Sequence, residues 1–382
     1  MVNINPTQNN NGLNMPLKIA YLSPSTLFSG KANAVHVMKM CQAFTKNNAE
    51  TTLFAQCQKP LDKNEAFQFY DVTTKFDINI ISTFNISKIK TLTLGYKSAR
   101  KAKAISSDIA YSRLISGAFF ACLMGIKSVL EIHSKPNIYE RIFLKQIVKS
   151  KFFLGIVVIS SPLKDMIVDI FSISPEKIFI HHDGADITDH SHIKIPYKSD
   201  NNAPNIAYIG SLYKGRGIDV ITQIAQMRPA YNFHIIGKIN DIDTQSTPPN
   251  MKFHGAVPFK HTEAFRHHAD ILIAPYQSSV RTSSGDDTTR WMSPLKIFEY
   301  MGSKTPFICS ELPALQDIVT HGHDCLMCPA NATKKWADSI DMLLSDPDLT
   351  KKLSGNAFQK FCDHYTWEKR AKNILQDIRQ FL

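Results

Sequence analysis

The sequence lacks any hydrophobic run of about 18 residues, the length that a helix needs to cross a bilayer. Residues 1–16 are polar and rich in asparagine, without the basic and apolar regions of a signal peptide. We therefore expect no membrane-spanning segment, a cytoplasmic protein, and an irregular structure for residues 1–16.

Cysteine and metal-ligand patterns are also sparse. The seven cysteines are an odd number and lie mostly in apolar segments, as reduced, buried thiols do. Cys325 and Cys328 have CxxC spacing, but no second pair accompanies them. Asp241 and Asp243 have Asp-x-Asp spacing, but polar residues surround them. We interpret these pairs as a buried strand and a solvated loop, and we predict no metal and no cofactor.

The chain carries a net charge of +11, with 44 lysines and arginines against 33 aspartates and glutamates. This excess favours an anionic partner, which can be nucleic acid, a membrane surface or a phosphorylated substrate. No nucleic-acid-binding motif is present, and the aromatic residues do not alternate with the basic ones as a stacking surface requires. We therefore expect no nucleic acid partner.

The basic residues concentrate in segments 88–103 and 141–151, and both have the pattern of a helix with one basic and one apolar side. Helices of this kind can lie against anionic lipid headgroups. The alternative is an apolar stripe that faces the protein core beneath a solvated basic face.

Apolar strands alternate with helical patterns along nearly the whole chain. The first series of expected strands covers residues 18–22, 52–55, 108–112, 128–133, 155–160 and 177–181, and the second covers 205–209, 232–236, 252–254, 270–274, 306–309 and 325–328. This alternation predicts parallel sheets with helices on both faces. A chain of 382 residues with 43% hydrophobic content is long enough for two such domains.

We place the first domain at residues 17–190, the second at 205–362, and a C-terminal helix that packs back toward the first domain at 363–382. In open parallel sheets, ligands bind at the carboxyl ends of the strands, and two facing domains form a cleft. The predicted fold is therefore α/β, with two doubly wound, Rossmann-like domains that face an inter-domain cleft.

Glycine-containing loops follow strands at the edge where this rule places a ligand. Gly30 lies between the first strand and the next helix, where backbone amides can approach a ligand. The loop GSLYKGRG at 210–217 connects a strand to a helix, and its Lys214 and Arg216 suit a diphosphate. The alternative is a flexible basic surface loop. Gly237 closes another strand, where the loop can pass a base or ribose.

The most informative segment is residues 293–319, which predicts a helix over 296–301, a break at Gly302 and then a buried strand. Glu299 is a carboxylate in an otherwise apolar helix, and it can accept two hydrogen bonds from a ribose diol. Lys296 and the helix N-terminus favour phosphate. The pattern indicates nucleotide-sugar chemistry, and the alternative is a surface glutamate on an ordinary amphipathic helix.

The second half of the chain resembles the C-terminal nucleotide-binding domain of retaining GT-B glycosyltransferases of family 4. The segments that carry this resemblance are, in order, GSLYKGRGID, the strand end 235–237, ADILIAPY and SPLKIFEYMGSKTPFICSELPALQDIV. The first half agrees through the Gly30 loop, Glu-Ile-His at 131–133 and HHDGAD at 181–186. The resemblance covers residues 17–380.

The resemblance implies a metal-independent hexosyl- or N-acetylhexosaminyltransferase that retains the anomeric configuration. Its expected donor is a nucleotide-diphosphate sugar, a UDP-sugar rather than a GDP-sugar, and its acceptor is a saccharide or a polyprenyl-linked saccharide. The resemblance also implies cell-surface polysaccharide synthesis and a peripheral position at the anionic inner face of the cytoplasmic membrane.

The resemblance assigns roles only where positions match. Arg216 takes the place of a family lysine, whereas Ser211 stands where the family has arginine. Glu299 matches the second member of the family's Glu-x7-Glu pair and is expected on the ribose. Trp291 stands where the first member, which holds the donor sugar, is expected. His133 matches a histidine that faces the donor sugar, and its alternative is an ordinary core histidine.

The other expected contacts follow from the same motifs. Asp286 or Asp287, in the loop before Trp291, is the candidate replacement on the donor sugar. The residues expected to act at the reacting centre are His133, Arg216 and Lys296. Those expected to bind the nucleotide sugar are Gly30, Gly210, Ser211, Lys214, Gly237, Pro294, Leu295 and Glu299.

Two other classes of protein remain open. A sugar-nucleotide epimerase can share this two-domain shape and would need acid–base carboxylates at the anomeric side of the cleft. A non-catalytic partner subunit of GT-B shape is favoured by the departures at Ser211 and Trp291.

Overall fold

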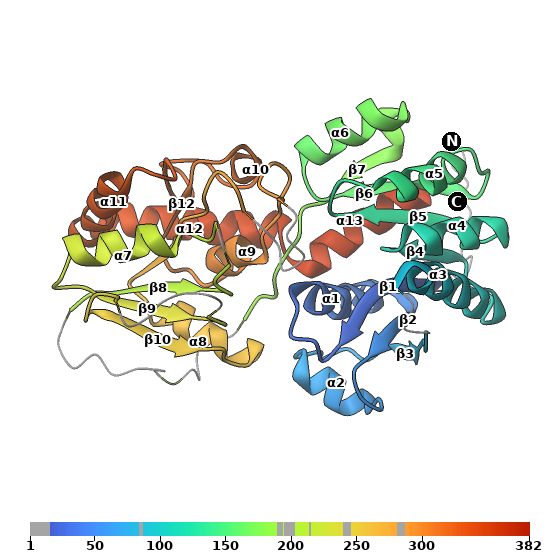
Figure 1. Ribbon diagram of the computed structural model, residues 1–382, viewed down its shortest axis with the longest axis horizontal. Helices are drawn as coiled ribbons and strands as arrows, with labels where there is room; N and C mark the ends of the chain where they lie inside the picture. The colour runs from blue at the N-terminus through green and yellow to red at the C-terminus, as the bar shows by residue number, and fades with distance from the viewer. Residues whose placement is uncertain are drawn as a thin grey trace, which may run out of the picture.

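The computed structural model describes residues 16–83, 87–188, 194, 203–213, 215–239, 246–280 and 287–382. These residues form two α/β units, each a parallel sheet with helices packed on it (Figure 1). The strands are nearly continuous apolar runs, as expected of sheets that are buried on both faces. Every residue of β4 (Ile109–Ser112) and β6 (Phe153–Val158) is buried.

The first unit contains a seven-stranded parallel sheet in the order β3-β2-β1-β4-β5-β6-β7. Its other strands are β1 (Leu17–Leu27), β2 (Ala49–Cys57), β3 (Asp77–Ile80), β5 (Lys127–Ile132) and β7 (Ile178–Ile180). Its helices are α1 (Ala32–Lys46), α2 (Lys63–Phe69), α3 (Ser87–Ala104), α4 (Ile115–Leu123), α5 (Ile138–Ile147) and α6 (Ser161–Phe171), with a 3₁₀ turn η1 (Pro175–Lys177).

The second unit contains a six-stranded parallel sheet in the order β10-β9-β8-β11-β12-β13. Its strands are β8 (Asn205–Ile209), β9 (Asn232–Ile236), β10 (Met251–Gly255), β11 (Ile271–Ala274), β12 (Phe307–Ser310) and β13 (Leu326–Cys328). Its helices are α7 (Ile218–Met227), α8 (Thr262–His267), α9 (Leu295–Gly302), α10 (Pro313–Gln316), α11 (Thr333–Ser345) and α12 (Pro347–His364), with a 3₁₀ turn η2 (Phe259–His261).

The last helix, α13 (Trp367–Arg379), lies in the first unit although it follows the second in sequence (Figure 1). Its apolar face enters the same core cluster as the buried residues of α1. The residues that do so are Trp367, Ala371, Ile374, Leu375 and Ile378. The chain therefore crosses between the units twice, and α13 brings C-terminal side chains to the first sheet.

The two units also meet near the carboxyl end of β6. The Trp291 side chain packs against the core formed by α4, α6 and their strands. Its carbonyl oxygen accepts a hydrogen bond from Ser160 Oγ at 3.1 Å. Asp317 Oδ2 accepts one from the Ser161 amide at 3.0 Å, at the start of α6. A carboxylate at a helix N-terminus also interacts favourably with the helix dipole.

The expected strands all coincide with observed ones, which confirms the two-sheet prediction. The pattern missed β3, a four-residue edge strand that is too short to show a period. Cys328 lies in a buried strand as predicted, and Asp241 and Asp243 fall outside the described residues. Among the helices that the structure describes, none combines the length and apolar character needed to cross a membrane.

One buried tyrosine fixes α9 against the second sheet. Tyr300 Oη accepts a hydrogen bond from the Ile209 amide at 3.0 Å and donates one to the Ile273 carbonyl at 3.3 Å. These residues belong to β8 and β11, so the contact holds the helix at the carboxyl ends of two adjacent strands.

Replacing Tyr300 with phenylalanine should lower the free energy of unfolding by about 1–3 kcal/mol, because the buried Ile209 amide would lose its acceptor. Urea denaturation measures this change. Tyr139→Phe, on a side chain that is 72% exposed, is the matched control and should change stability by less than about 0.5 kcal/mol. Equal stability of the two variants would show that the Tyr300 hydroxyl does not anchor α9.

Candidate functional site

Three glycines let the loops at the carboxyl edge of the second sheet touch backbone to backbone. Gly210 and Gly237 have positive φ angles of 144° and 149°, and a Cβ on Gly237 would lie 2.1 Å from the Gly210 carbonyl oxygen. Gly217, at φ 82°, precedes α7, and a Cβ there would lie 1.9 Å from the Pro275 carbonyl oxygen. Only glycine fits such positions.

Two cations lie next to these loops. Lys296, in the first turn of α9, is only 8% exposed, and its Nζ is 3.6 Å from the centre of the Tyr208 ring. The Arg216 guanidinium lies 5.2 Å from the centre of the Tyr276 ring. A Cβ on Gly210 would come within 3.0 Å of Lys296 Nζ, so this glycine also leaves room for the ammonium. Both cations therefore rest on aromatic faces at the same edge of the sheet.

Neither cation is fully neutralised within the described chain. Lys296 Nζ and Arg216 Nε are buried and have no hydrogen-bond acceptor among the described residues. Burial holds the pKa of Lys296 well below its ordinary value, Arg216 adds to this effect, and Glu299 opposes it. Buried donors without acceptors are costly. The arrangement therefore suits an anion that accepts hydrogen bonds from both side chains.

Glu299 lies on the same helix, where one of its oxygens is already held. Its Oε2 is 3.2 Å from Arg266 Nη1, and the same nitrogen donates to Thr262 Oγ1 at 2.9 Å. Arg266 is almost fully buried and fixes the carboxylate through Oε2. Sequence reasoning missed Arg266, because a single arginine in the short helix α8 carries no local signal of its partner 33 residues away.

The remaining predicted residues of this edge have varied positions. Pro294 precedes α9 and Leu295 begins it, and the Leu295 side chain packs against the core of the first unit. Ser211 is exposed. Gly30 has a positive φ of 64° in the loop before α1, with open space around it. Lys214 lies outside the described residues.

Of the two donor-sugar candidates, the structure describes only Asp287, whose carboxylate is engaged by neighbours in its own loop. Asp286 lies outside the described residues. Asp287 accepts hydrogen bonds from the Thr289 amide at 2.9 Å and from Ser279 Oγ at 2.9 Å, within its own loop. These hydrogen bonds, led by that from the Thr289 hydroxyl, lower the pKa of Asp287 to about 2. Trp291 is partly buried and packs against the core of the first unit.

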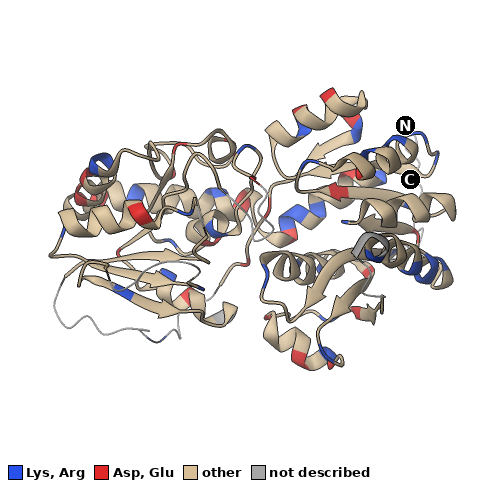
Figure 2. Ribbon diagram, in the orientation of Figure 1, with Lys and Arg blue, Asp and Glu red and all other residues tan. Residues whose placement is uncertain are grey.

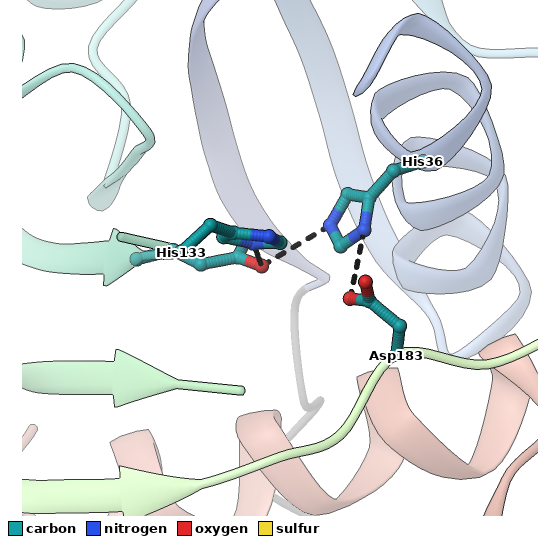
Figure 3. A group of neighbouring side chains, drawn as sticks. His36, His133 and Asp183 are labelled. Carbon is teal, nitrogen blue, oxygen red and sulfur yellow. Dashed lines mark hydrogen bonds and ion pairs between the residues drawn. The ribbon is translucent and has the colours of Figure 1, made fainter. Parts of the chain in front are cut away.

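A second cluster lies at the carboxyl end of β5. His133 Nε2 is 2.6 Å from Glu131 Oε1, so the two side chains lie on one side of the strand as the spacing predicts. Figure 3 shows His36, on α1, between His133 and Asp183. His36 Nε2 is 3.1 Å from Glu131 Oε1, and its Nδ1 is 3.0 Å from Asp183 Oδ1. Arg370, on α13, completes the cluster with Nη2 2.8 Å from Glu131 Oε1.

The charges in this cluster compensate one another. Burial alone would raise the pKa of Glu131, but Arg370 and the two histidines outweigh it and hold this pKa well below its ordinary value. Burial likewise opposes ionisation of Asp183, yet His36 and His133 bring its pKa to about 2. Burial lowers the pKa of His133 to about 4. At neutral pH the cluster therefore holds two carboxylates and a neutral His133.

His36, Glu131, His133 and Asp183 also have the composition of a metal site, because one ligand atom from each lies within 4.8 Å of the others. Arg370 changes this interpretation. Its guanidinium is 2.8 Å from Glu131 Oε1 and 3.9 Å from Asp183 Oδ1, so a fixed cation already lies beside both carboxylates. The cluster fits an arginine-centred network better than a metal centre.

The two clusters are adjacent. The Asp183 amide donates a hydrogen bond to Ser293 Oγ at 2.9 Å, and Ser293 lies two residues before α9. The His36 and His133 cluster of the first unit therefore lies beside the helix that carries Lys296 and Glu299.

Comparisons with known proteins agree with this architecture. The sequence model of the family Glycosyl transferases group 1 matches residues 203–346, which is most of the second unit. Comparison with curated protein sequences gives no significant match.

Solved structures resemble the whole chain. A glycosyltransferase from Rickettsia africae has a TM-score of 0.72 at 13% identity, over 96% of this chain and 98% of its own. Sucrose-phosphate synthase from Thermosynechococcus elongatus has a TM-score of 0.70 at 14% identity, over 95% and 98%. HepE from Anabaena, in complex with UDP, has a TM-score of 0.70 at 12% identity, over 96% and 100%.

These likenesses confirm the predicted fold class, two parallel-sheet units arranged as in GT-B glycosyltransferases. Together with the match over residues 203–346, they support a role in glycosyl transfer.

Lys296→Met should make the protein more stable, because it removes a buried ammonium that has no hydrogen-bond acceptor. We expect a gain on the order of 1 kcal/mol or more at pH 7. The folded state binds the Lys296 proton less tightly than the unfolded chain, so wild-type stability falls as the pH drops below the ordinary value of 10.5. The difference in unfolding free energy between Lys296→Met and wild type should therefore grow as the pH falls from 10 to 7.

Urea denaturation between pH 7 and 10 measures this difference, and Lys334→Met, on an exposed lysine of α11, is the control. A Lys296→Met protein that is less stable than wild type at every pH would contradict the claim that the unpaired Lys296 side chain lowers the stability of the ligand-free protein.

Proposed function

We propose that this protein is a retaining glycosyltransferase that moves a sugar from a nucleotide-diphosphate sugar to a saccharide or lipid-linked acceptor. The observation that carries the proposal is the pair Lys296 and Arg216 beside Glu299, at the ligand-binding edge of a Rossmann-like sheet. Lys296 Nζ and Arg216 Nε have no hydrogen-bond partner among the described residues. A diphosphate supplies acceptors for both cations, and the ribose next to it supplies two hydroxyls for Glu299.

A UDP-sugar is the proposed donor. Solved structures of HepE from Anabaena contain UDP, UDP-glucose, or UDP and glucose, and HepE shares the fold of this chain over nearly its whole length. We assign the transferred group to the hexoses or N-acetylhexosamines and the pathway to surface polysaccharide synthesis, in line with the resemblance of the sequence motifs.

The site supports a reaction without a protein nucleophile. Glu131 is fully buried and engaged by Arg370, His36 and His133, so it is not free to attack an anomeric carbon. In the proposed mechanism, Arg216 and Lys296 stabilise the charge that develops on the leaving diphosphate. The acceptor hydroxyl attacks the anomeric carbon from the same face as the bond to the diphosphate breaks, and its proton passes to an oxygen of the leaving phosphate. His133 contacts a sugar hydroxyl across the cleft.

Glu299→Ala should weaken UDP binding at least about tenfold, the equivalent of one hydrogen bond to a charged group. Arg216→Ala should weaken UDP binding and turnover similarly, and Arg216→Lys should recover only part because a point charge cannot replace a planar fork. Isothermal titration measures binding, with Glu311→Ala on an exposed carboxylate as control. Unchanged affinity in Glu299→Ala would exclude the ribose contact.

The same preparation separates the other two functions. Incubating the protein with a UDP-sugar and no acceptor would reveal an epimerase by conversion of the sugar. A partner subunit without activity would leave the UDP-sugar unchanged with every acceptor. Transfer with retention to an added saccharide excludes both.

An anionic membrane is the second proposed partner, and α3, α4 and α5 form the surface proposed to meet it. These helices pack side by side on the first unit, and Figure 2 shows lysines and arginines along α3 and α5. Arg100 and Lys103 are exposed on α3, whereas Lys97 donates a hydrogen bond to the Ser82 carbonyl and Lys101 donates one to Asn79 of β3.

Helix α5 combines charge with apolar exposure. Ile138 is 68% exposed and Ile142 is 60% exposed, and both lie on the face that continues to Lys145 and Lys149. This combination is typical of a helix that lies in the interface of an anionic bilayer.

Serine at Lys145, Lys149 and Lys151 should weaken co-sedimentation with anionic liposomes at least about tenfold, since each lysine contributes roughly 1 kcal/mol near such a surface. Ile138→Ser with Ile142→Ser should weaken it at high salt as well, where charge is screened. Serine at Lys334, Lys351 and Lys352 of the second unit is the matched control. Equal binding to neutral and anionic liposomes would contradict the proposal that these helices bind an anionic membrane.

A further inference from the structure

The buried carboxylate of Glu131 is the centre of the first-unit cluster. Its Oε1 accepts from Arg370 Nη2 at 2.8 Å and contacts His133 Nε2 at 2.6 Å, and its Oε2 accepts from Tyr21 Oη at 3.3 Å. The Glu131 side chain has no exposed surface, whereas that of His133 is 22% exposed. Of the three side chains Arg370, Glu131 and His133, only His133 is therefore exposed enough to contact a ligand.

The contact with Glu131 determines which nitrogen of His133 carries hydrogen. A carboxylate only accepts hydrogen bonds, so the 2.6 Å contact requires the hydrogen on His133 Nε2. Burial lowers the pKa of His133 to about 4, and a neutral ring has only one N–H. Nδ1 is then a lone-pair acceptor.

Arg370 keeps Glu131 in this state. It is 1% exposed, and it also donates to the His182 carbonyl at 2.8 Å and the His181 carbonyl at 3.2 Å. These bonds fix the guanidinium between α13 and the segment that leaves β7. Without Arg370, burial would favour a protonated Glu131, which can donate to His133 Nε2 and move the ring hydrogen to Nδ1.

We propose that Arg370 and Glu131 are positioning residues that fix the tautomer of His133, with Nε2 bound to Glu131 and Nδ1 presented as an acceptor for a sugar hydroxyl. This inference rests on the proposed glycosyl transfer. It gives the C-terminal helix α13 a part in the reaction, because that helix carries a residue that acts through His133 without touching substrate. It also explains why the buried, charged groups of Glu131 and Arg370 lie next to His133, at the carboxyl end of β5.

The first test is spectroscopic and needs no substrate. Nitrogen-15 spectra of the histidine rings should show His133, identified by its loss in His133→Asn, as the Nε2–H tautomer in the wild-type protein. Arg370→Met should shift the ring toward the Nδ1–H tautomer or a mixture, and Arg370→Lys should restore part of the wild-type signal. A wild-type His133 with its hydrogen on Nδ1 would overturn the proposal.

The second test is kinetic. With the transferred sugar and acceptor established, Arg370→Met and Glu131→Gln should each lower kcat at least about tenfold. Their affinity for UDP should stay within about twofold of wild type, because Arg216, Lys296 and Glu299 lie in the other unit. Unchanged UDP affinity also shows that the second unit of each variant is folded, and the urea denaturation midpoint of each variant checks the first unit.

The outcomes separate the two proposals. Full turnover in Arg370→Met would refute the positioning role and leave glycosyl transfer intact. Absence of UDP binding in the wild-type protein would refute the proposed function, and the tautomer measurement would still test the network.

Discussion

The buried ammonium of Lys296 is the constraint on which this account depends. A lysine beneath the loops of a parallel sheet, with Arg216 near it and no hydrogen-bond acceptor in the described chain, opposes folding of its own surroundings. The glycines at 210, 217 and 237 allow the loops to close around it, and Tyr300 holds its helix against two strands. Such an arrangement is explained most simply by an anionic ligand that the site is built to receive.

The first unit buries charge of the opposite sign. There, two buried carboxylates are contacted by Arg370 and by histidine nitrogens of the protein itself. One cluster thus presents cations to an anion and the other places its carboxylates beside cationic and imidazole groups, and the Asp183–Ser293 hydrogen bond joins them. A site divided in this way can bind a charged group on one side and orient a neutral sugar on the other.

The fold was largely predictable from the sequence, because strand and helix periods are local properties of the chain. The helix that carries Lys296 and Glu299 was found for the same reason. The arginines that pair with Glu131 and Glu299 were not predicted. Arg370 is 239 residues from Glu131, and Arg266 is 33 residues from Glu299, so their pairing exists only in the folded chain. His36 gave no signal, because a single histidine within an apolar helix has no pattern of its own.

Trp291 shows what a motif departure means physically. The resemblance places a sugar-binding carboxylate there, and the structure instead packs the indole into the core of the first unit. That substitution exchanges a polar ligand contact for an apolar contact between the units. The contact joins the second unit to the first near the carboxyl end of β6.

A crystal structure of the protein with bound UDP would show whether Lys296 and Arg216 form a diphosphate site. We expect diphosphate oxygens within hydrogen-bond distance of Lys296 Nζ and the Arg216 guanidinium, with the ribose hydroxyls on Glu299. A UDP molecule bound elsewhere, or a diphosphate that leaves both cations without an acceptor, would contradict this expectation.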